Sequence, residues 1–72
     1  MLLSQLKLNY QATIININCS EALKNRLKDI GVEIGTSIKL VRTAPFNDPL
    51  EFCCNGIYFA IRKSDCDKIE VK

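Results

Sequence analysis

The sequence predicts a mainly β fold, a small barrel of about five strands with one short α-helix and one helical turn. Three observations predict this class. β-Branched or alternating apolar segments recur along the chain, one stretch has the apolar spacing of a helix, and an Asn-Gly pair joins two apolar segments. The 72 residues leave room for one domain, 1–72, with a modest core, because a chain this short buries only about 60% of its unfolded surface.

The chain begins with an apolar arm that contains Leu2, Leu3 and Leu6. Asn9 follows this arm, and because asparagine tolerates positive φ it suits a turn. The segment from Gln11 to Ile17 is rich in β-branched residues, which favour extended backbone. We therefore expect a turn at Asn9 and the first strand over 11–17.

A short helix is expected after this strand. Ser20 can cap its N-terminus, and an apolar stripe follows at i, i+4 and i+7: Leu23, Leu27 and Ile30. Gly31 stands where the helix needs a left-handed residue to end, a conformation that glycine enters without steric penalty. Gly35 marks a second bend, so this segment predicts a helix, a turn and the start of a strand.

A second strand is predicted from Thr36 to Thr43, with Ile38, Leu40 and Val41 as its apolar members. The next six residues, 44–49, are expected to form a loop. Two prolines there remove backbone donors, and Asn-Asp is typical of turns, so regular structure cannot continue through the segment.

Asn55-Gly56 is the strongest local signal, because a type I′ hairpin turn needs positive φ at both central residues. A two-residue turn fixes the register of the strands on either side, 50–54 and 57–62. The expected pairs are Leu50 with Ile61, Glu51 with Ala60, Phe52 with Phe59, Cys53 with Tyr58, and Cys54 with Ile57. One face is then entirely apolar and forms core: Leu50, Phe52, Cys54, Ile57, Phe59 and Ile61. Cys54 should be buried, and Cys53 should lie on the mixed face.

The C-terminal segment predicts a helical turn and a closing strand. Ser64 can cap a single turn over residues 64–67, and Ile69 to Val71 has the composition of a strand. This last strand would pair a sheet edge that would otherwise stay open.

Composition and charge exclude several classes of protein. The net charge of +2 is small and the basic residues are interspersed with acidic ones, so we expect no nucleic-acid partner. No apolar run reaches the 18 residues of a membrane span, and the N-terminus lacks the pattern of a secretory signal. We therefore expect a cytoplasmic protein that does not insert into a membrane.

The residues that could perform chemistry do not form a recognisable site. There is no histidine to activate a nucleophile, and no glycine-rich phosphate loop. The four cysteines lack a Cys-x-x-Cys spacing; buried free thiols are favoured over metal ligands, although thiolates from distant parts of the chain could still meet. Asp65 and Asp67 are two residues apart in a helical turn, so capping or solvation is the favoured role. We expect no enzyme activity, no cofactor and no metal site.

The order of these elements resembles the ferrous iron transport protein A (FeoA) family. The matching residues run through nearly the whole chain: Leu3, Leu6, Ala12, Ile14, Arg26-Leu27, Ile30-Gly31, Gly35, Pro45, Asp48-Pro49, Gly56, Ala60-Ile61-Arg62, Ile69 and Val71. Asn9 and Asn47 stand where the family has glycine, and asparagine also tolerates positive φ. The resemblance implies an SH3-like barrel and an accessory role in bacterial ferrous iron uptake, through contact with the cytoplasmic GTPase region of the transporter FeoB.

The partner surface is expected to include the loop that carries Phe46, flanked by Arg42, because loops on a rigid scaffold often make contacts. The alternative is that Phe46 covers one end of the barrel, since aromatic burial is strongly favoured. Two other functions stay open, an SH3-like domain that docks on a metal-dependent transcriptional repressor and a small nucleic-acid-binding barrel. Self-association through a sheet edge or the N-terminal arm also stays open.

Overall fold

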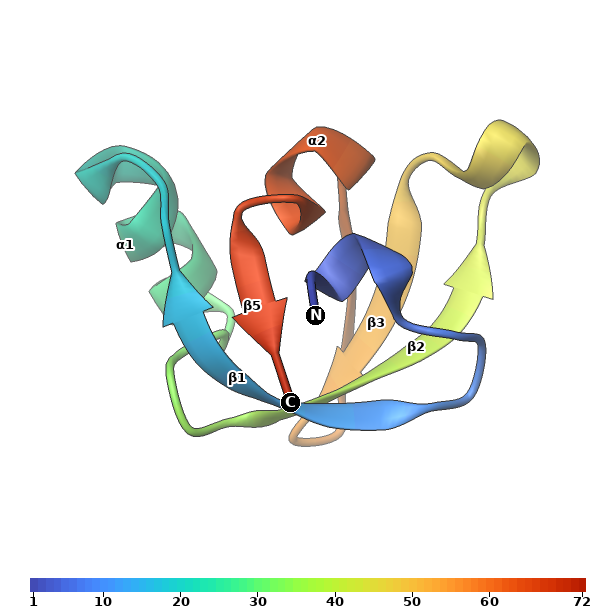
Figure 1. Cartoon of the computed structure of the whole chain (residues 1–72), viewed down its shortest axis with the longest axis horizontal. Coiled ribbons are helices and arrows are strands. Elements are labelled where there is room, and N and C mark those ends of the chain that lie inside the picture. The colour runs from blue at the N-terminus through green and yellow to red at the C-terminus, as the bar shows by residue number, and fades with distance from the viewer.

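The computed structural model describes all 72 residues, and its centre is one curved antiparallel sheet of five strands (Figure 1). The order across the sheet is β4-β3-β2-β1-β5, so β4 and β5 are the two edges. The strands are β1 (Gln11–Ile17), β2 (Ser37–Thr43), β3 (Leu50–Cys54), β4 (Ile57–Ile61) and β5 (Ile69–Val71). The helical segments are η1 (Leu3–Gln5), α1 (Glu21–Asp29), η2 (Pro45–Asn47) and α2 (Lys63–Cys66). The mainly β prediction is therefore confirmed.

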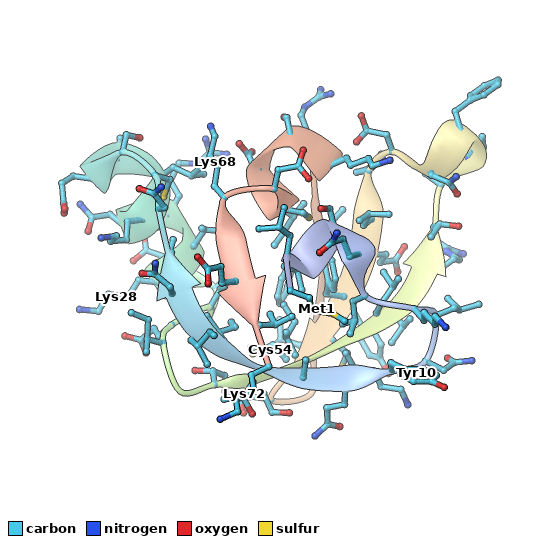
Figure 2. All side chains as sticks on the ribbon, viewed as in Figure 1. Met1, Tyr10, Lys28, Cys54, Lys68 and Lys72 are labelled. Carbon is cyan, nitrogen blue, oxygen red and sulfur yellow. The ribbon has the colours of Figure 1, made fainter.

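The core lies inside the curve of the sheet and holds no polar side chain. Its sixteen residues come from every strand, from η1, α1 and α2, and from the segments between them: Leu3, Leu6, Ala12, Ile14, Ile17, Leu27, Val32, Ile38, Leu40, Leu50, Phe52, Cys54, Ile61, Cys66, Ile69 and Val71. Figure 2 shows the labelled Cys54 among these enclosed side chains. Because a small domain gains its stability chiefly from apolar burial, this core is what holds the strands at fixed positions.

The two chain ends meet at one edge of the sheet. The N-terminal ammonium group of Met1 donates a hydrogen bond of 3.0 Å to the carbonyl oxygen of Val71, and Leu2 forms a bridge with Glu70. N and C lie close together in Figure 1 for this reason. β5 pairs with β1 along one edge, and the N-terminal arm covers its other edge.

The β3–β4 hairpin has the register that the Asn-Gly turn predicts at all five pairs. Asn55 and Gly56 both have positive φ, 53° and 79°, as a type I′ turn requires. The prediction that the whole inner face is buried is wrong at one residue: Ile57, on the edge strand β4, is 55% exposed, although its partner Cys54 on β3 is buried. Phe59 is half-buried, with its ring centroid 6.5 Å from that of Phe52.

Local sequence signals account for the bounds of α1. The Oγ of Ser20 accepts a hydrogen bond of 3.3 Å from the main-chain N–H of Leu23, so the predicted cap is confirmed. Of the apolar stripe only Leu27 is fully buried, while Leu23 and Ile30 pack against the edge of the core. The helix ends before Gly31, whose φ of +94° turns the chain toward β2.

The predicted cap of the second helix is wrong. Ser64 lies inside α2, which begins at Lys63 and receives no side-chain cap from the preceding Arg62. The main-chain N–H of Lys63 instead donates a hydrogen bond of 3.0 Å to Oδ1 of Asp48, fifteen residues earlier. A side chain distant in sequence therefore satisfies the helix N-terminus, which local sequence reasoning does not reveal.

Candidate partner-binding surface

An irregularity in the pairing of β2 with β3 sets the position of Arg42. Leu40 pairs with Phe52 but Arg42 pairs with Glu51, so two steps along β2 correspond to one along β3 and Val41 is the extra residue. Bulges of this kind redirect the side chains that follow them. Here the bulge places Arg42 directly opposite Glu51.

Arg42 and Glu51 form an ion pair on the outside of the sheet. The Nη2 and Nε atoms of Arg42 both donate to Oε2 of Glu51, at 2.9 and 3.2 Å, and the arginine side chain is 75% exposed. An exposed pair of this kind contributes roughly 0–1 kcal/mol to stability. Its main consequence is geometric, because the carboxylate holds the guanidinium group in one orientation while leaving its other N–H donors free.

Phe46 projects from η2, the loop that follows β2, and its side chain is fully exposed at 100%. The alternative that Phe46 covers one end of the barrel is therefore wrong. Its backbone has φ +64°, which is uncommon for a bulky residue and is strained. Two backbone hydrogen bonds close the loop around it, from Asn47 N–H to the Ala44 carbonyl at 2.9 Å and from Ala44 N–H to the Pro49 carbonyl at 3.1 Å.

The predicted contact residues thus lie at the same end of the sheet, on separate segments. Arg42 is on β2 and Phe46 is on η2, which lies beyond the ends of β2 and β3 in Figure 1. The predicted turn residues Gly31, Gly35, Asn55 and Gly56 all have positive φ. They lie on the turns at the opposite ends of β2 and β3, so they shape the sheet without lining this surface.

The four cysteine thiols form neither a disulfide nor part of a metal-binding cluster. All four are free, and no group of three or more His, Cys, Asp or Glu residues could hold a metal ion. Burial raises the pKa of the Cys54 thiol, and the nearby Cys53 raises it further. Burial is also the main cause that raises the pKa of Cys66 to about 12, with Asp65, Asp67 and Asp48 adding to it. Both buried thiols therefore stay protonated at neutral pH, and a protonated thiol is a poor nucleophile and a poor ligand.

The two carboxylates near the C-terminus have structural partners. Oδ1 of Asp65 lies 3.7 Å from the Nζ of Lys68, and Oδ1 of Asp67 accepts a hydrogen bond from the hydroxyl group of Ser4. The second contact fastens η1 to the end of α2. Neither carboxylate caps α2, so the predicted capping role is not observed, whereas Asp67 is exposed to solvent and Asp65 is partly exposed.

Sequence reasoning did not identify a groove between α1 and β4. Its apolar lining includes Leu23, Ile30 and Phe59, which the sequence assigned to the core but which are only partly buried. Arg26 and Arg62 lie on its rim. The periodicity of the helix and of the strand indicated apolar faces correctly, but it could not show that these two faces stop short of contact.

The curved five-stranded sheet with its short helical segments defines a small SH3-like barrel. The family model described as "FeoA domain" matches residues 1–72. The chain therefore belongs to the FeoA domain family.

Three relatives show the extent of this similarity. The chain is 31% identical over all 72 residues to the Fe(2+) transport protein A/Fe(2+) transporter FeoB fusion protein of Porphyromonas gingivalis, and spans 8% of that protein's length. The solution structure of FeoA from Chlorobium tepidum has a TM-score of 0.93 and 35% identity, covering 99% of this chain and 68% of that one. FeoA from Stenotrophomonas maltophilia, a prokaryotic SH3 domain protein in complex with zinc, has a TM-score of 0.85 and 26% identity, covering 100% of this chain and 89% of that one.

No helix of the structure combines the length and the apolar character needed to cross a bilayer.

Proposed function

We propose that this protein is a non-enzymatic accessory protein of bacterial ferrous iron uptake, which acts in the cytoplasm by binding the GTPase region of FeoB. The observation that carries the proposal is the Porphyromonas gingivalis relative, in which a segment 31% identical to the whole of this chain is joined to FeoB. Fusion raises the effective concentration of two domains into the millimolar range, so the two domains can associate even when the intrinsic affinity of their interface is low.

The surface that would make this contact is the end of the sheet where η2 carries Phe46. The positive φ of Phe46 is costly within this chain, and a partner that buries its fully exposed ring would offset this cost. Full burial of such a side chain contributes about 1.5–3 kcal/mol. Arg42, oriented by Glu51, adds a planar donor group at the same end.

The absence of histidine and the protonation of the buried Cys54 and Cys66 thiols support a non-enzymatic role, because neither buried thiol is activated as a nucleophile. In this proposal the protein neither carries nor transforms iron. It changes the transporter by occupying a surface of it.

Binding of the purified protein to the soluble GTPase domain of the cognate FeoB tests the proposal. The affinity should be measured by isothermal titration calorimetry with the domain free of nucleotide, with GDP, and with a non-hydrolysable GTP analogue. We expect binding in at least one nucleotide state. The substitution Phe46→Ala should weaken it by roughly 10- to 100-fold, the factor that corresponds to burial of one phenylalanine.

Ile34→Ala is the matched control. Ile34 is 63% exposed and precedes β2, whereas Phe46 follows β2, so the control removes a similar apolar side chain at the opposite end of the strand. The control should leave the affinity unchanged. The proposal would be contradicted by failure to bind in every nucleotide state, with membranes containing full-length FeoB included, or by tight, salt-sensitive binding to RNA or duplex DNA instead.

A further inference from the structure

The strand β4 has one free edge. In an antiparallel pair the backbone groups of alternate residues face the partner strand, and the two-residue turn directs those of Ile57, Phe59 and Ile61 toward β3. The main-chain N–H and C=O groups of Tyr58 and Ala60 therefore face away from the sheet. No hydrogen bond from a turn, loop or side chain reaches them.

A groove of about 600 Å³ lies beside this edge, with α1 as its other wall. The inner-face residues Phe59 and Ile61 line it from β4, and Leu23, Leu27 and Ile30 line it from α1. The C-terminal end of α1 is fixed near the hairpin tip, because the thiol of Cys54 donates to the Gly31 carbonyl at 3.5 Å. Ala60, whose main-chain groups are unpaired, also lines this groove, so the groove lies directly beside the free edge of β4.

Two guanidinium groups at the rim of this groove have no acidic partner. Arg26 on α1 and Arg62 at the end of β4 both line it, and neither lies within 4 Å of a carboxylate. The one acidic residue in the lining, Asp65, is already paired with Lys68. The rim is therefore positively charged, and it complements a ligand that carries a carboxylate.

We propose that the β4 edge binds an extended peptide segment of a partner protein as an added strand. The main chain of the peptide pairs with Tyr58 and Ala60, one apolar side chain enters the groove, and an acidic side chain contacts Arg26 and Arg62. Strand addition at an open edge obtains affinity from main-chain hydrogen bonds and specificity from alternate side chains. The unpaired main-chain groups of β4 provide the first, and the groove with its arginine rim provides the second.

A second copy of this chain fits the same edge less well. Pairing of two β4 edges would place two copies of the Arg26 and Arg62 rim in one interface. Four guanidinium groups without carboxylates repel one another, whereas an acidic peptide neutralises the rim. Charge therefore favours a peptide of a different sequence as the occupant.

The site is distinct from the surface that carries Phe46, and the inference does not depend on FeoB as the partner. The two regions are close, however. Pro49 and Ala60 line both this groove and a second depression formed by Arg42, Pro45 and Glu51. A segment bound along β4 would thus run toward the η2 loop.

Panning of the immobilised full chain against a phage-displayed library of random heptapeptides tests the proposal. We expect enriched peptides in which apolar residues alternate and at least one acidic residue is present. A synthetic peptide of the enriched sequence, titrated into the isotopically labelled protein, should shift the amide NMR signals of Tyr58 and Ala60 and the side-chain signals of Leu23 and Phe59.

Substitutions at the edge separate strand addition from nonspecific contact. Ala60→Pro removes an N–H group that makes no hydrogen bond within the sheet. The substitution should therefore lower the affinity for the peptide about tenfold or more while the protein stays folded. Ala60→Val is its matched control, since it keeps the N–H and should keep the affinity within about threefold. If Ala60→Pro fails to fold, the substitutions of Arg26 and Arg62 by glutamate test the proposal in its place.

The double substitution Arg26→Glu and Arg62→Glu should abolish binding of the acidic peptide at low salt, whereas Lys39→Glu, which changes a charge on β2, should not. The proposal is overturned if the library gives no enrichment above a blank surface or if the enriched peptides are basic. It is equally overturned if binding survives Ala60→Pro, or if sedimentation shows a dimer that Ala60→Pro dissolves.

Discussion

The main-chain N–H of Lys63 donates a 3.0 Å hydrogen bond to Oδ1 of Asp48, and this contact joins the loop after η2 to the first turn of α2. Asp48 lies two residues after Phe46, so the bond anchors the base of the exposed loop to the C-terminal part of the chain. A carboxylate at a helix N-terminus also interacts favourably with the positive end of the helix dipole.

Substitution Asp48→Ala should lower the free energy of unfolding by about 0.5–2 kcal/mol, the usual effect of removing a helix cap. Asp48→Asn retains the Oδ1 acceptor and should lower the free energy of unfolding clearly less than Asp48→Ala does. Urea denaturation followed by circular dichroism measures both. Equal losses for the two substitutions would show that the negative charge, and not the acceptor, makes the contribution.

The hairpin shows how far local sequence determines this fold. Asn55-Gly56 fixed the pairing of β3 with β4 because a two-residue turn leaves no freedom of register. The contact between Lys63 and Asp48 was not predictable in the same way, since it joins segments that meet only after the sheet has formed. Ser64, the better local candidate for a cap, lies inside α2 instead.

The candidate surface was only partly predictable for a similar reason. Sequence placed Phe46 in a loop, but aromatic composition alone could not distinguish an exposed ring from one that covers the barrel. No sequence signal marked the bulge at Val41, so the pairing of Arg42 with Glu51 was missed. The groove beside β4 depends on the distance between two apolar faces, which periodicity does not encode.

Gly35 provides a test of backbone strain without steric contact. Its φ is +93°, and a Cβ added there would meet no atom within 4 Å. Gly35→Ala should therefore destabilise the protein by about 1–2 kcal/mol through conformation alone. Gly35→Asn should cost less, because asparagine enters this region more readily, as Asn9, Asn47 and Asn55 do in this chain.

Urea denaturation again measures the difference between these two variants. Equal destabilisation by Ala and Asn at position 35 would contradict backbone strain as the cause, because asparagine tolerates positive φ better than alanine. The N–H of Gly35 donates to the Ile14 carbonyl at 2.7 Å, and both variants keep this donor.

Because of Cys66, the free energy of unfolding should fall as the pH rises above about 9. Burial, helped by Asp65, Asp67 and Asp48, raises the pKa of its thiol from 9.0 to about 12 in the folded protein. Between these two values the unfolded chain loses the thiol proton while the folded chain keeps it, so the unfolded state binds fewer protons and stability falls as pH rises. Below pH 9 the contribution is fully present.

Cys66→Ala should flatten this decline relative to the wild type, although it lowers stability at pH 7 because a buried side chain is truncated. The measurement is the urea midpoint at several pH values from 7 to 11, compared between the two proteins, so that contributions common to both cancel. Parallel curves for the two proteins would show that the thiol does not make this contribution.

Phe46 should show opposite effects on stability and on binding. A φ of +64° destabilises a residue that has a Cβ by about 1–2 kcal/mol, and the exposed ring of Phe46 adds no stabilisation through packing. Phe46→Gly should raise the free energy of unfolding by about 0.5–1 kcal/mol, after allowance for the greater freedom of glycine in the unfolded chain. Phe46→Ala keeps the Cβ and should stay within about 0.5 kcal/mol of the wild type.

Both variants should bind the FeoB GTPase domain more weakly, because each removes the ring. Stability from urea denaturation and affinity from calorimetry would then move in opposite directions for Phe46→Gly. That combination is expected where a protein maintains local strain in order to present a contact residue. A loss of stability in Phe46→Gly would instead mean that the ring packs within this chain, and Phe46 would no longer be a candidate for the partner contact.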